Sequence, residues 1–166
     1  NNTALTVLSC PYNQLTALDV SANTALTTLY CGGSSSTSGV TNPLTSLDVS
    51  NNTALTALSC STNELNNLDV SSNTALTYLS CGGNDLTGLD ISNNAALTSL
   101  YGSGNELATL DVSNNTALVN LSIGSNVLAT LDVSNNTALE YIYCGDNQLE
   151  SLDVSNNLAL TNLSCA

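Results

Sequence analysis

Hydrophobic and polar positions alternate along this chain in one recurring pattern. The segment from Leu55 to Ala75 contains two consecutive copies of L-x-x-L-x-(C/V)-x-x-N, the first within 10 residues and the second within 11. In Leu-Ser-Cys and Leu-Asp-Val, strand-like alternation turns Leu and Cys or Val inward, and Ser or Asp outward. The pattern therefore predicts short strands near residues 57–59 and 67–69, and at the equivalent positions of every other copy.

The pattern repeats with a fixed period. The tetrapeptide Leu-Asp-(Val/Ile)-Ser occurs seven times at intervals of 21 residues, except for a first interval of 29, which is 21 plus 8. Such a period is the signature of a solenoid, in which each coil contacts only its neighbours. The short half-repeats end in Asn, Ser, Thr or Gly and leave no room for a helix. We therefore predict an all-β parallel solenoid of about eight coils with little or no helix, forming a single domain over residues 1–166.

The eight extra residues of the first interval lie between Gly33 and Asn42, in the segment SSSTSGVT. We predict a loop insertion at residues 34–41 that leaves the stack of coils undisturbed. The composition is typical of a flexible linker. Insertions in repeat proteins often lie on the binding face, so a role of this loop in binding remains open.

The repeat resembles the leucine-rich repeat family, and in particular its nested 21-residue bacterial class, sometimes called IRREKO, whose members are secreted or surface proteins. The resemblance rests on the two nested copies of L-x-x-L-x-(C/V)-x-x-N and covers essentially the whole chain. It implies a parallel β solenoid with a binding or adhesion role and no enzymatic activity. The chain departs from better-known members because it has no helical segment and no visible cap. Its first residues, Asn1–Leu5, match Asn51–Leu55 within the array, so we expect a segment of a larger array.

Charge narrows the choice of partners. The net charge is −13, and the chain has no Lys, Arg or His. Phosphate binding requires basic side chains, so nucleic acid is excluded as a partner, and an anionic membrane surface is disfavoured. No apolar run approaches the roughly 18 residues of a membrane span, so we expect no membrane insertion. Acid–base catalysis and oxyanion stabilisation have no basic group to use, so we predict that the protein is not an enzyme.

The aspartates of the tetrapeptide are predicted to stack in one column. Neighbouring strands lie about 4.8 Å apart, where like charges repel by about 1 kcal/mol in bulk water. Raised pKa values, hydrogen bonds from Ser or backbone N–H groups (Ser71 to Asp69, for example) or bound cations would each offset this repulsion. Ca²⁺ prefers oxygen ligands and is the candidate cofactor. Its candidate ligands are Asp19, Asp48, Asp69, Asp90, Asp111, Asp132 and Asp153.

Cysteine and asparagine form further columns. The six cysteines share one inward position, which Gly102 and Ile123 occupy in two coils, and we interpret them as small core hydrophobes. Neighbouring coils also bring their Cα atoms within disulfide range, so the pairs Cys10–Cys31, Cys60–Cys81 and Cys144–Cys165 remain an alternative. Two asparagine columns, which contain Asn63 and Asn73, are expected to satisfy backbone groups at the bends of successive coils.

The first half of each repeat carries outward tyrosines among Ser, Thr and Asn. This composition is typical of adaptable binding surfaces, although β propensity alone also favours Tyr on strands. The candidate ligand-binding residues are Tyr30, Tyr78, Tyr101, Tyr141 and Tyr143.

We therefore predict an extracellular or cell-surface module for adhesion or ligand binding, with a protein or a glycan as partner. A structural rod or filament subunit is the alternative, because exposed parallel edges favour end-to-end self-association. Rows of threonine that include Thr6, Thr27 and Thr56 suggest a less favoured ice-binding function. These rows are interrupted at Val119 and Glu140 and contain no Thr-x-Thr strand.

Overall fold

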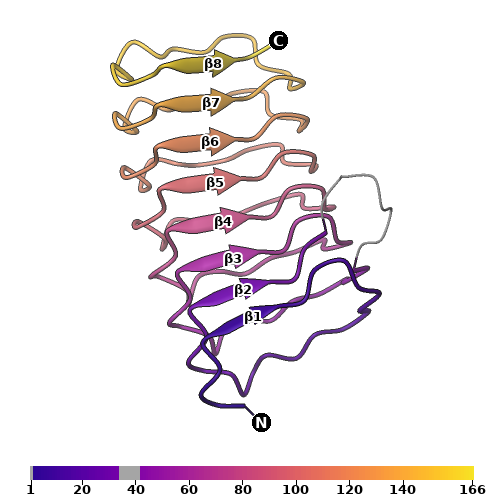
Figure 1. Cartoon of the computed structure of the whole chain (residues 1–166). Helices are drawn as coiled ribbons and strands as arrows, with labels where there is room; N and C mark the ends of the chain where they lie inside the picture. The colour runs from indigo at the N-terminus through magenta and orange to yellow at the C-terminus, as the bar shows by residue number, and fades with distance from the viewer. Residues whose placement is uncertain (1, 34–41) are drawn as a thin grey trace.

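The chain winds into a stack of coils, each of which contributes one short strand to a single parallel sheet (Figure 1). The computed structural model describes residues 2–33 and 42–166, and within these ranges it contains no helix. The eight strands follow one another in sequence order, which makes seven complete turns from the first strand to the last. The predicted all-β parallel solenoid is thus confirmed. The strands are β1 (Val7–Ser9), β2 (Thr28–Tyr30), β3 (Ala57–Ser59), β4 (Tyr78–Ser80), β5 (Ser99–Tyr101), β6 (Asn120–Ser122), β7 (Tyr141–Tyr143) and β8 (Asn162–Ser164).

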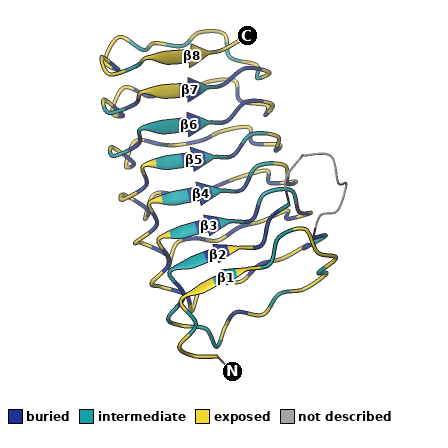
Figure 2. Cartoon of the chain, viewed as in Figure 1, coloured by how far each residue is buried: buried dark blue, intermediate teal, exposed yellow. Residues whose placement is uncertain are grey.

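The strands stack in register, so equivalent residues of successive coils form columns. Leu58 of β3 pairs with Leu79 of β4, and Leu79 pairs with Leu100 of β5. These three side chains are fully buried, and each stabilises the fold by about 1.5–3 kcal/mol. Figure 2 shows exposed residues on β1, β7 and β8 and around the turns of every coil, whereas the strands of the middle coils are mostly half-buried. The core is therefore a narrow aliphatic column, as the composition indicated.

The second predicted row of strands is wrong. Residues 67–69 and their equivalents form no strand, although Leu68 and Val70 face inward as expected. In the described part of the chain, no backbone N–H of residues 66–70 donates to a neighbouring coil. The coils are joined by backbone hydrogen bonds along the strands and at the turns, whereas on this opposite side they are joined largely through side chains.

Those side chains are the predicted asparagines, and both columns bond as expected. Asn84 Nδ2 donates to the carbonyls of Cys60 (3.1 Å) and Cys81 (2.8 Å), while its Oδ1 accepts from the Leu65 N–H (3.1 Å). Asn73 Nδ2 donates to Val49 O and Asn52 O, but its buried Oδ1 has no hydrogen-bond partner. Asn73 and Asn84 thus each connect their own coil to the preceding one.

A column of left-handed residues follows the strands. Gly83 and Gly104 have φ values of 64° and 69°, a conformation that glycine adopts at no steric cost. Thr62, Ser125 and Asp146 occupy the same position with φ values of 56°, 52° and 54°. Thr62 is β-branched and therefore strained in this conformation.

The six cysteines are free thiols in the structure, which agrees with their interpretation as core hydrophobes. Cys31, Cys60, Cys81 and Cys144 are buried, whereas Cys10 is half-buried and Cys165 is exposed. Burial raises the pKa of both Cys31 and Cys81 to about 12. These thiols therefore remain protonated and unreactive at neutral pH, since the thiolate is the nucleophile.

The predicted insertion at residues 34–41 lies outside the described residues. Among the residues that are described, no helix has the length and hydropathy to cross a membrane.

Candidate binding surface

The outward side chains of the sheet form a polar face that carries the predicted tyrosines. Tyr78 and Tyr101 come from adjacent strands, and their ring centroids lie 5.6 Å apart with a 45° tilt between the planes. Tyr141 and Tyr143 are the two outward residues of β7, while Tyr30 lies on β2, separated from Tyr78 by β3. The face thus presents a tyrosine pair in its middle and two more tyrosines on β7.

This face is almost free of charge. The outward strand residues other than tyrosine are Val, Ala, Ser, Thr and Asn, and Glu140 is the acidic residue next to β7. Tyr30 and Tyr141 are 40% and 37% exposed, so their rings are accessible to a ligand. Rigid amphipathic tyrosines among small polar residues supply contact area at low entropic cost.

A hollow lies beside this face, at the carboxyl ends of the strands, and the sequence analysis did not identify it. Its lining includes the glycines at positions 82, 83 and 104, together with Tyr101 and Tyr143. Serine hydroxyls line it in pairs: Ser61 Oγ is 2.7 Å from Ser80 Oγ, and Ser103 Oγ is 2.9 Å from Ser122 Oγ. Clustered glycines after successive strands, as in Cys81-Gly82-Gly83 and Gly102-Ser103-Gly104, were the available sequence signal.

The ring of Tyr143 is held against the neighbouring coil. A Cβ atom on Gly124 would collide with this ring, so the ring occupies the space above that glycine. The Tyr143 hydroxyl lies 3.5 Å from Asp146 Oδ2, to which Ser125 Oγ also donates at 3.3 Å. Tyr143 is therefore pre-ordered in one orientation at the end of the hollow.

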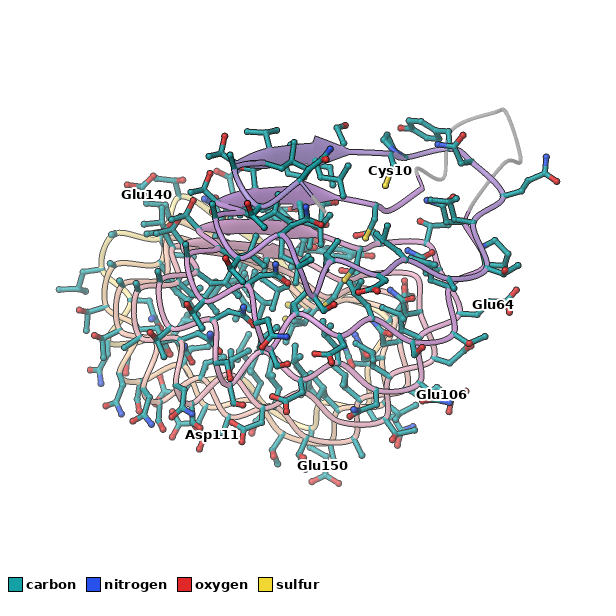
Figure 3. All side chains as sticks on the ribbon, turned by 90° about the horizontal axis from the view of Figure 1, so that it is seen from below. Cys10, Glu64, Glu106, Asp111, Glu140 and Glu150 are labelled. Atoms are coloured by element: carbon teal, nitrogen blue, oxygen red, sulfur yellow. The ribbon has the colours of Figure 1, made fainter. Side chains whose placement is uncertain are left out.

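The predicted aspartate column lies away from the strands, where Asp111 points outward (Figure 3). All seven aspartates accept a hydrogen bond from the backbone N–H two residues on, as Asp69 Oδ1 does from Ser71 at 2.9 Å. Hydrogen bonds from the Ser71 hydroxyl and N–H lower the pKa of Asp69, against an opposing contribution from the charge of Asp90. Of the three outcomes expected for the column, serine hydrogen bonding is confirmed and raised pKa values are wrong.

A second hollow lies between the coils on this side. Asp69, Asp90 and Asp111 line it together with Leu68 and Leu89. Across residues 2–33 and 42–166, no three acidic or cysteine side chains gather closely enough to hold a metal ion. Binding of Ca²⁺ by the aspartate column stays a prediction.

The fold is that of known leucine-rich repeat proteins. The functional domain of InlJ from Listeria monocytogenes, which includes a cysteine ladder, is 44% identical over 99% of this chain, with a TM-score of 0.92, and the match covers 35% of that structure. A leucine-rich repeat protein of Leptospira interrogans is 26% identical over 97% of the chain and 43% of its own, with a TM-score of 0.87. The internalin InlF of L. monocytogenes is 24% identical over 89% of the chain and 43% of its own (TM-score 0.79) and is similar in fold alone. The chain therefore spans about a third of the InlJ structure and less than half of the other two.

Comparisons with sequence families and curated proteins are less informative than those with solved structures. A family model described as the LVIVD repeat matches residues 66–103, which are 38 of the 166 residues and do not decide the family. No curated protein matches the chain significantly. The likeness to InlJ and to the leucine-rich repeat protein of Leptospira interrogans supports the leucine-rich repeat family.

Proposed function

We propose that this leucine-rich repeat chain is a non-catalytic adhesion module of a secreted or surface protein of the nested 21-residue bacterial class. Its strand face binds a protein ligand through Tyr30, Tyr78 and Tyr141, with Tyr101 and Tyr143 beside them. The likeness to the internalins and to InlJ supports a ligand-binding or adhesion role.

One observation carries the proposal. Five of the six tyrosines lie on the strands, on a face that has almost no charge in a chain with net charge −13, and Tyr30 and Tyr141 are exposed there; the exposed Tyr12 lies after β1, outside that face. Acidic side chains such as Glu64, Glu106, Asp111 and Glu150 point outward elsewhere around the coils (Figure 3). The strand face is therefore the surface on which a protein can bury area without desolvating carboxylates.

Adhesion of coated beads to cultured cells tests the proposal. The chain has no lysine, so coupling through its α-amino group gives every molecule the same orientation on the bead. Replacing Tyr30, Tyr78 and Tyr141 with serine should abolish adhesion, since tyrosines commonly supply most of the energy of an interface. Replacing Asp69, Asp90 and Asp111 with asparagine is the matched control and should leave adhesion intact.

Enzymatic and chemical treatment of the cells distinguishes a protein ligand from a glycan ligand. Protease treatment of the cells should remove adhesion if the ligand is a protein, whereas periodate oxidation of surface sugars should not. Adhesion that survives the triple tyrosine substitution, with the fold verified by circular dichroism, would overturn the assignment of the strand face.

A further inference from the structure

We propose that the hollow at the carboxyl ends of β3 to β7 binds a neutral saccharide, a second ligand that goes beyond the protein ligand proposed for the strand face. Tyr101 and Tyr143 would contact the faces of sugar rings, and the serines between them would bond the sugar hydroxyls.

The dimensions of the hollow suit a small ligand. The hollow is open to solvent and offers about 550 Å³, within the roughly 300–1,000 Å³ of small-molecule sites. Glycines in its lining let a ligand approach the backbone closely, and the two tyrosines stand two strands apart, on β5 and β7. An oligosaccharide, rather than a single sugar, would span that separation.

The available hydrogen-bonding groups favour a sugar over a peptide. The backbone around the hollow is already committed between coils, since Thr62 N–H donates to Gly82 O, Gly83 N–H to Ser103 O and Gly104 N–H to Gly124 O. A peptide strand would need these groups for backbone pairing. What remains are serine hydroxyls. In each of the pairs Ser61–Ser80 and Ser103–Ser122 one hydroxyl donates to the other, which leaves each pair one O–H donor and several acceptor lone pairs for the hydroxyls of a saccharide.

Charge selects among saccharides. No acidic side chain is among the described residues that line the hollow, and the carboxylate of Asp146 beside it is bonded to the lining residues Ser125 and Tyr143. The chain carries 13 acidic residues and no basic one. The hollow has no group that could pair with a sulfate, phosphate or uronate, and the net negative charge of the chain repels such groups at a distance. The pre-ordered ring of Tyr143 lowers the entropic cost of stacking on a neutral sugar.

A variant at Gly104 closes the hollow without unfolding the chain. Other coils place Thr62, Ser125 and Asp146 at the equivalent left-handed position, and asparagine tolerates this conformation. A Cβ at Gly104 would meet Gly83 N at 3.5 Å, an ordinary contact. Gly104→Asn therefore adds a side chain to the lining of the hollow, while Asn67→Ala, an exposed residue on the aspartate side of the coils, is the control.

The test is an array of immobilised neutral and anionic oligosaccharides, followed by titration calorimetry with the neutral compound that binds best. We expect binding to neutral compounds, weakened at least about tenfold by Gly104→Asn and by Tyr143→Ala, and unchanged by Asn67→Ala; tenfold corresponds to about 1.4 kcal/mol. Preference for anionic compounds, or binding unaffected by Gly104→Asn, would overturn the proposal. The array could give no signal at millimolar concentration while the beads still adhere through the strand face. That result would overturn the saccharide site and leave the proposed function standing.

Discussion

Gly102 occupies a buried position that holds cysteine in six coils and isoleucine in one, so alanine at this position should stabilise the protein. A Cβ atom there would lie 3.8 Å from Cys81 Sγ and 4.0 Å from Ile123 Cγ2, ordinary van der Waals distances with no clash. Alanine restricts the unfolded chain by about 0.4–1 kcal/mol relative to glycine. Burial of its methyl group contributes about 0.8 kcal/mol more.

Gly102→Ala should therefore raise the free energy of unfolding by about 1–2 kcal/mol. In a protein of this size the melting temperature should rise by roughly 2–8 °C. Urea unfolding followed by circular dichroism measures the first quantity, and calorimetry the second.

Gly82 provides the matched control, because it lies in the same region of the preceding coil but has no free space. A Cβ there would approach Ser103 O, a backbone atom, to 2.6 Å. Gly82→Ala should destabilise the chain by about 1–3 kcal/mol, as overpacking commonly does. If both variants shift stability in the same direction, the difference in space that the structure assigns to these two glycines is incorrect.

Four further predictions test other columns. Thr62→Gly should stabilise the chain by about 1 kcal/mol in urea unfolding, because it relieves the steric strain of a β-branched residue in the left-handed conformation. The control Thr56→Gly removes a hydrogen bond to Thr27 O and should destabilise the chain. Asn84→Ala should cost about 1–3 kcal/mol by the same measurement, because the buried Leu65 N–H loses its acceptor, whereas the Cys60 and Cys81 carbonyls keep their bonds from Asn63 and Asn105. The exposed Asn67→Ala should change stability by less than about 0.5 kcal/mol. The pKa values of all seven column aspartates are lowered in the folded chain, so the folded state binds fewer protons than the unfolded state in acid. The resulting contribution to the free energy of unfolding is present above the ordinary pKa of about 3.9. It is lost as pH falls through the folded pKa, so the urea midpoint should decrease as the pH is lowered from about 5 to about 3. A midpoint that rises over this range would contradict the argument. If the column binds Ca²⁺, millimolar CaCl₂ should raise the melting temperature more than NaCl of equal ionic strength; equal melting in the two salts would exclude that role.

The columns were predictable because a repeat of fixed length places equivalent residues above one another. The buried leucines, the inward cysteines and the asparagine bonds of Asn84 follow from that rule alone. The second strand row failed because alternation reports which side chains face inward. It does not report whether adjacent backbones come within hydrogen-bonding distance, and residues 66–70 have the first property without the second.

The hollow was missed for a related reason. It depends on glycines and serines of several coils meeting at one edge, and on the orientation of the Tyr143 ring over Gly124. The sequence contains both residue types but says nothing about the direction of that side chain. The sign of the aspartate pKa shift was also inaccessible, since it depends on how closely the Ser71 hydroxyl and N–H approach Asp69.

The asparagine bonds between coils also bear on how such an array changes in length during evolution. The Leu65 N–H bonds to Asn84, and the Leu86 N–H makes the identical bond to Asn105, in both cases across 19 residues. Loss of residues 76–96, one 21-residue unit, would leave Leu65 facing Asn105 in the same geometry. Recombination between repeated gene segments can therefore lengthen or shorten the stack by whole coils, because every new junction reproduces contacts that already exist.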